Sequence, residues 1–251
     1  SPEALDSLKY ELQKLEEEYP ELVTSDSPTQ RVAGKPLKEL KKYRHKVPQW
    51  SFSDAFTPDD IREFDERVKR FLKSETGRDL KPTYTMELKI DGLKIVFEYV
   101  KGELVAAATR GDGRVGEDVT HNIRTIDSVP FTLREKVDVI VEGEVWMSTK
   151  NLERLNKERQ KAGEEVFANP RNVAAGSIRQ LDPSITRARN LDTFIYDIAS
   201  ANFDLPKTQH EELEKIKKLG FKINPHFKHV KTIEEVIAFW EIWQRRAKKE
   251  E

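Results

Sequence analysis

The stretch LKIVFEYVKGELVAAAT, residues 93–109, determines the fold class. Leu93 to Tyr99 is a strand-like run rich in β-branched and aromatic residues, and the turn Lys101-Gly102 leads into a second run that ends at Thr109. Two such runs separated by a glycine-containing turn are typical of an antiparallel hairpin. We therefore expect this hairpin to lie at the centre of a sheet.

Further strands and helices are predicted on both sides of the hairpin. Strands are expected at 84–90, where Met86, Leu88 and Ile90 alternate with charged residues, and at 137–147 and 194–198. Helices are predicted by apolar residues at three- and four-residue steps, in the sets Leu5, Leu8, Leu12 and Leu15 (ending near Tyr19-Pro20), Ile61, Phe64, Val68 and Phe71, and Val236, Phe239, Trp240 and Trp243. Two more are expected at 149–160 and around Leu213, Ile216 and Leu219, and a linker at 24–36. This order predicts an α+β fold with an antiparallel core.

Composition excludes several classes of protein. The chain has 251 residues, 44 Lys plus Arg against 45 Asp plus Glu, and no cysteine. It therefore has no disulfide, thiolate zinc site or cysteine nucleophile. Apolar runs are too short for a membrane helix and the N-terminus lacks signal-peptide character, so we expect a soluble, cytoplasmic protein with no membrane contact. Because the net charge is −1, binding to nucleic acid would require a local basic surface.

The segment Glu87-Leu88-Lys89-Ile90-Asp91-Gly92 is a candidate for covalent chemistry. If the strand alternation holds, Glu87, Lys89 and Asp91 share one face, an unusual set to bury together. A lysine becomes a good nucleophile when burial or a nearby cation favours its neutral form. The alternative interpretation, an exposed charged strand face, is common for an isolated Lys-x-Asp-Gly sequence.

Three later segments make the chemical interpretation more specific. Residues 109–118 contain three glycines and Arg110, a composition that lets backbone and guanidinium approach phosphate or ribose oxygens. Glu142-Gly143-Glu144 places carboxylates at the end of a predicted strand, where they could accept ribose hydroxyls or hold a metal ion. The third segment is FANPRNVAAGSIRQLDP, residues 167–183.

This ordered set of motifs resembles the adenylation (nucleotidyltransferase) domain of the NAD-dependent bacterial DNA ligases, closely over residues 46–230. The resemblance implies a lysine-adenylating, ATP-grasp-like DNA ligase core of antiparallel sheets with flanking helices. It divides the chain into a partial N-terminal NMN-binding subdomain with its linker, 1–45, and a nucleotidyltransferase domain, 46–251. FANPRN is specific to these enzymes, whereas Lys-x-Asp-Gly also occurs in other lysine-adenylating ligases and in capping enzymes.

The resemblance also implies roles for individual residues. Lys89 matches the nucleophile that takes AMP in a phosphoramidate bond, Asp91 belongs to the same motif, and Arg110 matches the arginine near ribose and phosphate. Cofactor contacts are implied for Glu87, which reads the adenine amino group, for Tyr196, which stacks on the base, and for Ser51, Phe52, Glu144 and Asp6. Glu144 is also the implied metal-side carboxylate, and Arg171 and Arg179 match arginines linked to the nick.

The implied cofactors are NAD, through its AMP moiety, and Mg²⁺, and the implied macromolecular partner is nicked double-stranded DNA. The chain is expected to be a monomer. Between Ala168 and Asn190 there are four arginines and one acid, which predicts the local basic surface that DNA binding requires.

The chain also departs from the family pattern at both ends. In Pro2-Glu3-Ala4-Leu5-Asp6 only Asp6 matches the NMN-binding pattern, and two family strands that carry phosphate-side lysines are not found after Lys249. We therefore expect self-adenylation to be slow or absent and nick sealing by this chain alone to be undetectable. Two alternatives remain open at this stage, an ATP- or GTP-using nucleotidyltransferase such as an RNA ligase or capping enzyme, and a non-catalytic nucleic-acid-binding module.

Overall fold

The computed structural model describes residues 8, 11–12, 14–24, 27, 37–50 and 53–250, with the backbone alone for 247–250. The chain divides into two compact units, which we describe separately. The larger unit comprises Ser1–Gln49, Ile90–Lys207 and Glu211–Ile223. The smaller unit comprises Trp50–Lys89, Thr208–His210 and Asn224–Glu251.

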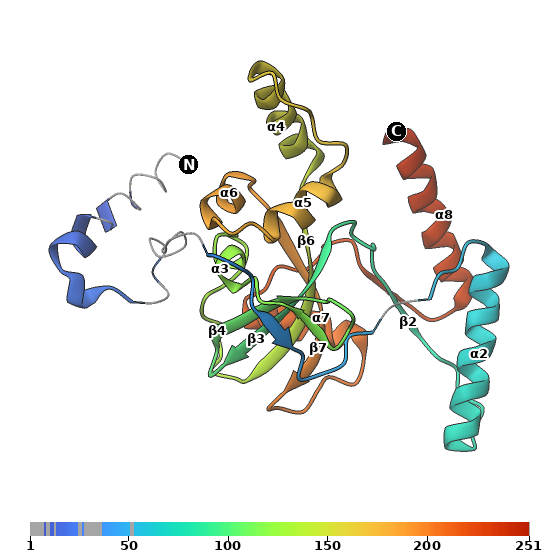
Figure 1. Ribbon diagram of the computed structural model, residues 1–251. Helices are drawn as coiled ribbons and strands as arrows, with labels where there is room; N and C mark the ends of the chain where they lie inside the picture. Colours follow the sequence, from blue (N-terminus) through green and yellow to red (C-terminus); the bar gives the residue numbers. More distant parts are fainter. Residues whose placement is uncertain are drawn as a thin grey trace. The chain divides into compact units, whose positions relative to one another are not determined.

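The larger unit contains a four-stranded antiparallel sheet in the order β4-β3-β6-β7 (Figure 1). Its strands are β3 (Leu93–Val100), β4 (Glu103–Thr109), β6 (Val139–Trp146) and β7 (Asp192–Ala201). A separate two-stranded ladder pairs β1 (Lys42–Arg44) with β5 (Val115–Glu117). The other elements of this unit are η1 (Pro20–Leu22), α3 (Thr120–Ile123), α4 (Thr149–Lys161), α5 (Pro170–Ile178), α6 (Pro183–Ala188) and α7 (Gln209–Leu219), whose first two residues group with the smaller unit.

The predicted central hairpin is confirmed. Strands β3 and β4 pair antiparallel, and the turn residues Lys101 and Gly102 both have positive φ, 51° and 80°. Such a turn matches the right-handed twist of the flanking strands, and glycine adopts its positive φ without steric cost. The strand predicted at 137–147 and the helix predicted at 149–160 also form, whereas β7 is longer than the predicted 194–198.

One face of the four-stranded sheet forms the apolar core. Residues that lie directly opposite each other in an antiparallel ladder have side chains on the same face. The buried set Ile95, Phe97, Tyr99, Val139, Val141, Val145, Ile195 and Ile198 occupies this face. Phe221, just after α7, packs edge-on against Tyr99 with a ring-centroid distance of 5.3 Å. The predicted apolar stripe Leu213, Ile216 and Leu219 is buried in α7, and the helix ends at Leu219, directly before Gly220, whose φ is 107°.

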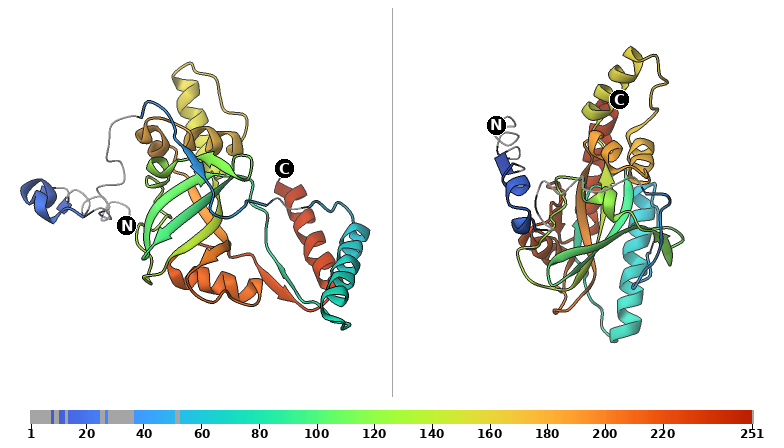
Figure 2. Two further views of the ribbon diagram at one scale, coloured as in Figure 1. Left: turned by 60° about the horizontal axis from the view of Figure 1, so that its bottom comes forward. Right: turned by 60° about the vertical axis from the view of Figure 1, so that its left-hand side comes forward.

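Three short helices, α3, α5 and α6, gather beside one another in the larger unit (Figure 2). Asn169 and Asp182 cap α5 and α6 with their side chains, and a proline follows each cap at the first helical position. Asn122 of α3 donates to the carbonyl of Ile178 at 2.6 Å. Much of the FANPRNVAAGSIRQLDP segment therefore specifies two capped helices.

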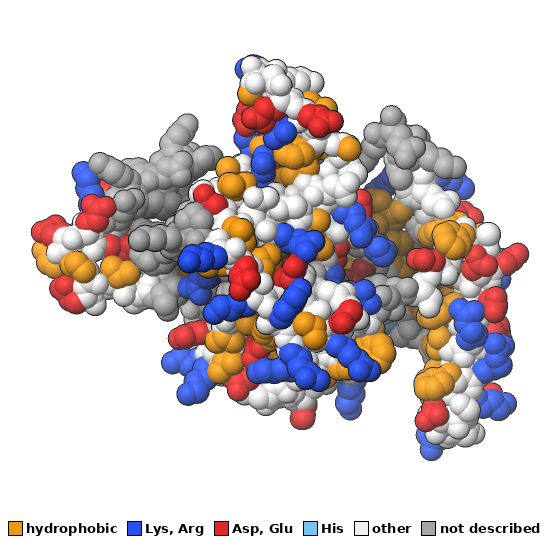
Figure 3. All heavy atoms as spheres, in the orientation of Figure 1, with side chains coloured by type: hydrophobic (Ala, Val, Ile, Leu, Met, Phe, Trp, Pro, Cys, Tyr) orange, Lys and Arg blue, Asp and Glu red, His pale blue; other side chains and the backbone are white. Residues whose placement is uncertain are grey.

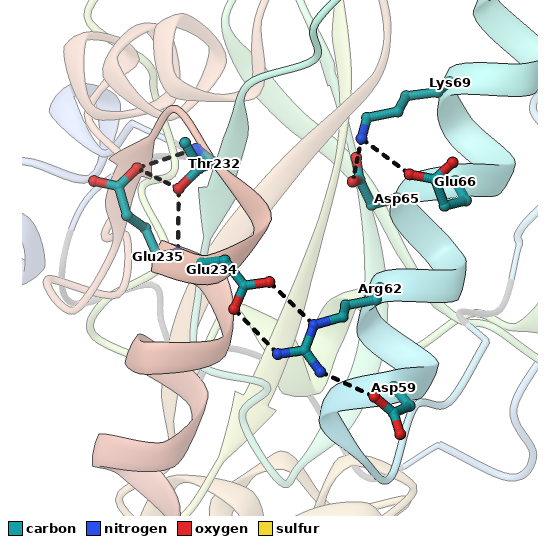
Figure 4. A network of polar contacts seen from close by, with 8 residues as sticks. All are labelled: Asp59, Arg62, Asp65, Glu66, Lys69, Thr232, Glu234 and Glu235. Atoms are coloured by element: carbon teal, nitrogen blue, oxygen red, sulfur yellow. Dashed lines mark hydrogen bonds and ion pairs between the residues drawn. The ribbon is translucent and has the colours of Figure 1, made fainter.

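The smaller unit pairs two helices with a short ladder. Its elements are α2 (Pro58–Thr76), α8 (Ile233–Glu250) and the antiparallel strands β2 (Tyr84–Met86) and β8 (Lys228–Val230). Thr57 precedes α2 in a capping box, in which its side chain and that of Asp60 each accept a hydrogen bond from the other residue's backbone N–H. Arg62 of α2 forms a two-pronged contact with Glu234 of α8, with N–O distances of 3.0 and 3.1 Å (Figure 4).

The predicted helix forms as α2, but its apolar stripe is only partly buried. Within the expected α2 stripe, Ile61 is buried, but Phe64 and Phe71 are 45% and 64% exposed, so much of the stripe is uncovered. At the N-terminus, residues 8, 11–12 and 14–18 are helical as predicted, whereas Leu5 and most of the predicted linker lie outside the described residues. Within the described part of the chain, no helix has the length and apolar character needed to cross a bilayer.

Candidate active site

The segment Glu87–Gly92 has a different conformation from the one predicted. Strand β2 ends at Met86 because its partner β8 has only three residues, and Met86 pairs with the first of them, Lys228. The predicted strand face shared by Glu87, Lys89 and Asp91 therefore does not form. Glu87 is half-buried and accepts a hydrogen bond from Gln209 at 3.1 Å, whereas Lys89 is exposed.

Gly92 brings the end of this motif close to β6. A Cβ atom at Gly92 would lie 2.2 Å from the carbonyl oxygen of Val145 and 2.9 Å from Cγ of Glu144. Only glycine allows this approach, because real Cβ atoms do not reach such distances. The backbone at Gly92 therefore lies against Glu144, one of the predicted site residues.

The face of the sheet opposite the apolar core carries charged residues. The pairing registers place Lys94 and Glu98 of β3, Glu142 and Glu144 of β6, and Asp197 of β7 on this face. We call these five residues the charged face. Lys94 Nζ and Glu142 Oε2 form an ion pair at 2.5 Å, with 15% and 9% of the two side chains exposed. The sequence did not predict this ion pair, because it joins residues of two neighbouring strands that are far apart in the chain.

Asp197 of the charged face has a raised pKa. Burial raises its pKa, and the negative charges of Glu212 and Glu142 and a hydrogen bond with Glu212 raise it further, to about 7, against a smaller opposing effect of Lys94. Glu212 also accepts a hydrogen bond from the backbone N–H of Ile198 at 2.7 Å. The first turn of α7 is thereby tied to β7 beside Tyr196.

Tyr196 occupies a β-bulge. Glu142 and Gly143 are consecutive in β6, but they pair with Asp197 and Ile195, so Tyr196 is the extra residue of β7. The backbone N–H of Ile195 donates instead to the carbonyl of Lys222 at 2.9 Å. Bulges often lie next to active sites because they redirect a side chain. The sequence did not predict this bulge, which lies at Tyr196, the residue proposed to stack on the base.

The glycine-rich segment after β4 folds back on itself. Cβ atoms at Gly111 and Gly116 would lie 1.9 and 1.8 Å from the carbonyl oxygens of Val115 and Thr109. The sequence predicts that these glycines allow close approach of a phosphate or ribose. The described close approaches of both glycines are to the chain's own backbone, and an approach to phosphate or ribose stays a prediction. Arg110 begins the turn, and its Nε is buried without a hydrogen-bond partner among the described residues.

His45 is a site-associated residue to which the sequence analysis assigned no role. Its Nε2 lies 3.0 Å from the carbonyl oxygen of Thr109 and 3.1 Å from that of Arg110. Both partners are acceptors, so Nε2 carries the proton and donates to both. The backbone N–H of His45 also donates to Arg114 at 2.9 Å, so His45 holds both ends of the turn that begins at Arg110. No local pattern indicates this role, because its carbonyl partners lie 64 and 65 residues further along the chain.

The predicted basic surface is largely neutralised within the larger unit. Arg171 pairs with Asp91 at 2.9 Å, and Arg179 forms a fork onto Glu117 at 2.7 and 3.0 Å. Arg187 pairs with Asp127, while the guanidinium of Arg189 lies 5.0 Å from the ring of Phe167. On the face drawn in Figure 3, Lys and Arg side chains are interspersed with Asp and Glu. The four arginines therefore do not form the separate positive surface that the sequence predicted.

Several predicted residues cannot be placed. Asp6, Ser51 and Phe52 lie outside the described residues. The described residues contain no group of three or more His, Cys, Asp or Glu side chains arranged to hold a metal ion. Mg²⁺ commonly binds one or two carboxylates together with substrate phosphates, so a single carboxylate such as Glu144 fits that mode.

The larger unit combines an antiparallel sheet that has one charged face, a glycine (Gly92) packed against a strand glutamate, and a hydrogen-bonded turn that carries Arg110. These features agree with the nucleotidyltransferase class that the sequence predicts. Comparison with known proteins identifies the family. The profile described as NAD-dependent DNA ligase adenylation domain matches residues 37–250, and the one described as DNA ligase-like, N-terminal NAD+-binding domain matches residues 3–33. The chain belongs to the family of NAD-dependent DNA ligase adenylation domains.

Individual relatives agree with this assignment. The chain is 48% identical over 247 residues to a DNA ligase of Thermotoga petrophila, covering 98% of this chain and 35% of the relative. It is 45% identical over 241 residues to a DNA ligase of Shouchella clausii, with coverages of 96% and 35%. It is 49% identical over 232 residues to a DNA ligase of Thermoanaerobacter sp., with coverages of 92% and 34%. The chain thus spans about a third of the length of these relatives.

Proposed function

We propose that Lys89 attacks the phosphorus of the AMP half of NAD. The new bond is a phosphoramidate between Nζ and that phosphorus, the phosphoanhydride bond to NMN breaks, and the amine loses a proton. In the complete ligase, the AMP then passes to the 5′ phosphate of a DNA nick, and the 3′ hydroxyl seals the nick with release of AMP. Each step is a phosphoryl-type transfer that depends on positioning and on charge neutralisation.

The observation that carries this proposal is the packing of Gly92 against Glu144 and Val145. It places the last residue of the nucleophile motif beside the carboxylate proposed to face the ribose and metal. A glycine is required here, because any larger side chain would overlap the β6 backbone. The proposal therefore rests on a backbone contact that requires the glycine of the Lys-x-Asp-Gly motif.

Other residues have supporting roles in the proposal. Arg110 contacts the ribose or phosphate from a turn that is fixed by His45, and Tyr196 stacks on the adenine from its bulge. Glu144 would hold Mg²⁺ together with the substrate phosphates, and when bound the ion would neutralise developing negative charge. Asp91, paired with Arg171, and Arg179 remain proposed to act in catalysis and at the nick, respectively.

The direct test is intact-protein mass spectrometry after incubation with NAD or ATP in the presence of Mg²⁺. Because self-adenylation by this chain is expected to be slow, the incubation is followed over a long time course. A gain of one AMP with NAD only, absent in Lys89→Ala, would support the proposal. Lys150→Ala provides a matched control, since Lys150 is an exposed lysine on α4 with no proposed role. Retention of the gain in Lys89→Ala would contradict the assignment of the nucleophile.

Two other outcomes distinguish the alternatives. AMP transfer from ATP would support an ATP-using nucleotidyltransferase. If neither dinucleotide nor triphosphate adds AMP, the chain acts at most as a nucleotide- or nucleic-acid-binding module. A nucleic-acid-binding module would be expected to have a strongly basic surface. The basic and acidic side chains on the face drawn in Figure 3 are interspersed, which weakens this second candidate.

A further inference from the structure

We propose that Gln209 is a positioning residue that sets adenine specificity by orienting Glu87. This inference rests on the proposed function, because it takes Glu87 as the group that reads the base. Gln209 is the first residue of α7, and its side-chain Nε2 donates to Oε1 of Glu87 at 3.1 Å, with both side chains half-buried.

Both partners of this hydrogen bond are fixed by the same two-stranded ladder. Glu87 directly follows the last residue of β2, which pairs with β8. Gln209 is followed by His210, whose ring stacks on that of His229 in β8 at 5.8 Å and lies 5.6 Å from that of Phe227. The hydrogen bond therefore connects two positions that are already held in place, so it can select one orientation of the carboxylate.

Hydrogen-bond chemistry explains why a glutamine suits this position. An ionised carboxylate only accepts hydrogen bonds, so the amide nitrogen of Gln209 must face Glu87. A neutral donor leaves the negative charge of Glu87 in place. The carboxylate therefore keeps acceptor capacity for the adenine amino group, in a plane that Gln209 fixes.

This arrangement predicts selectivity among purine dinucleotides. Adenine presents an amino group to Glu87, whereas hypoxanthine presents a carbonyl oxygen at the same place. A site built to hydrogen-bond a substrate donor discriminates strongly against an analogue that lacks it. Gln209 should thus affect binding of NAD and have little influence on deamino-NAD, in which hypoxanthine replaces adenine.

The experiment measures the dissociation constants of NAD and deamino-NAD by calorimetry, and the rate of AMP transfer to Lys89, for the chain as it stands. Wild type should prefer NAD. Gln209→Leu should weaken NAD binding about tenfold, as expected for losing a hydrogen bond to a charged group, with KM raised, kcat unchanged and deamino-NAD unaffected. Gln244→Leu, at an exposed glutamine of α8 in the same unit, is the matched control.

Two further variants separate positioning from folding. Gln209→Glu keeps the side-chain shape but opposes Glu87 with a like charge, so it should also lose NAD selectively if Gln209→Leu folds poorly. In a Glu87→Leu background, which has no acceptor for Gln209, Gln209→Leu should add nothing. Equal weakening of both dinucleotides, or full additivity, would overturn the inference about Gln209. Failure of wild type to bind or react with either dinucleotide would instead overturn the proposed function.

Discussion

Among single residues, Asp197 couples the charged face to pH. Its pKa rises from 3.8 to about 7 on folding, first through burial and then through Glu212 and Glu142. Between these two values the folded state binds more protons than the unfolded state, so the free energy of unfolding falls as pH rises and levels off above about pH 7. Asp197 therefore destabilises the fold most at alkaline pH.

Asp197→Asn removes this ionisation while keeping a hydrogen-bond donor for Glu212. We expect it to raise the free energy of unfolding by about 1–3 kcal/mol at alkaline pH and by almost nothing near the pKa of a free carboxyl. Urea unfolding of both proteins at the two pH values measures the difference. Asp204→Asn, at an exposed aspartate, is the control. A stabilisation that is the same at both pH values would mean that the pKa of Asp197 is not raised in the folded state.

His45 provides a second test at this scale. Its Nε2 donates to the carbonyl oxygens of Thr109 and Arg110, so His45→Leu should loosen the turn that presents Arg110. We expect kcat/KM for AMP transfer to fall roughly tenfold, in keeping with one or two lost hydrogen bonds.

His45→Gln keeps a side-chain donor and should restore part of the rate of AMP transfer. Thermal melting of both variants reports on folding. If the glutamine and leucine variants lose the same activity, the donor is not what matters at position 45.

The sequence identified several site residues but not their partners. Lys89, Arg110 and Glu144 stand out through local motifs, and their proposed roles come from the resemblance to ligases. The pairing of Arg171 with Asp91 and of Arg179 with Glu117 joins residues that are far apart in the chain. Such contacts depend on tertiary structure, so local patterns predicted arginines available for DNA and missed their neutralisation.

At the scale of elements, local turn and capping signals predicted the structure best. The hairpin at Lys101-Gly102 and the capped start of α2 follow from residues within a few positions of each other. The three-residue strands β1, β5 and β8 were missed, because each is defined by a partner that is distant in sequence. The same reason explains why β2 is shorter than predicted. Its alternating sequence continues past Met86, but its partner β8 begins at Lys228, opposite Met86.

The junction between the Lys-x-Asp-Gly segment and the sheet gives a prediction at this scale. Gly92→Ala would place Cβ 2.2 Å from the carbonyl oxygen of Val145, so β3 or β6 must shift. We expect a loss of about 1–3 kcal/mol in the free energy of unfolding, as for overpacking, together with loss of AMP transfer.

Gly176→Ala is the matched control for this junction, because a Cβ in α5 meets nothing within 4 Å. It should be neutral or stabilise by about 0.4–1 kcal/mol through the lower entropy of the unfolded chain. Urea unfolding compares the two variants directly. Tolerance of alanine at Gly92 would mean that the motif does not require this close contact.

For the whole molecule, charge is balanced both overall and locally. The chain has 44 basic and 45 acidic residues, and within the larger unit three of the four arginines between Ala168 and Asn190 pair with carboxylates. Favourable binding to a duplex depends on cations that can replace the counterions of phosphates. Arginines that are already paired must exchange partners, so we expect the chain alone to bind nicked DNA weakly and with a shallow salt dependence.

This expectation can be tested by releasing one arginine. Glu117→Gln removes the carboxylate that both Nε and Nη2 of Arg179 contact, and leaves the size of the side chain unchanged. If Arg179 then engages a phosphate, the affinity for nicked duplex should rise and the slope of log K against log salt should steepen by about 0.9, the value for one added contact. Fluorescence anisotropy over a salt series measures both quantities. Glu153→Gln, at an exposed glutamate of α4, should change neither. An unchanged slope in Glu117→Gln would mean that Arg179 serves the fold rather than the nick, since neutralising its partner would not have made its charge available to DNA.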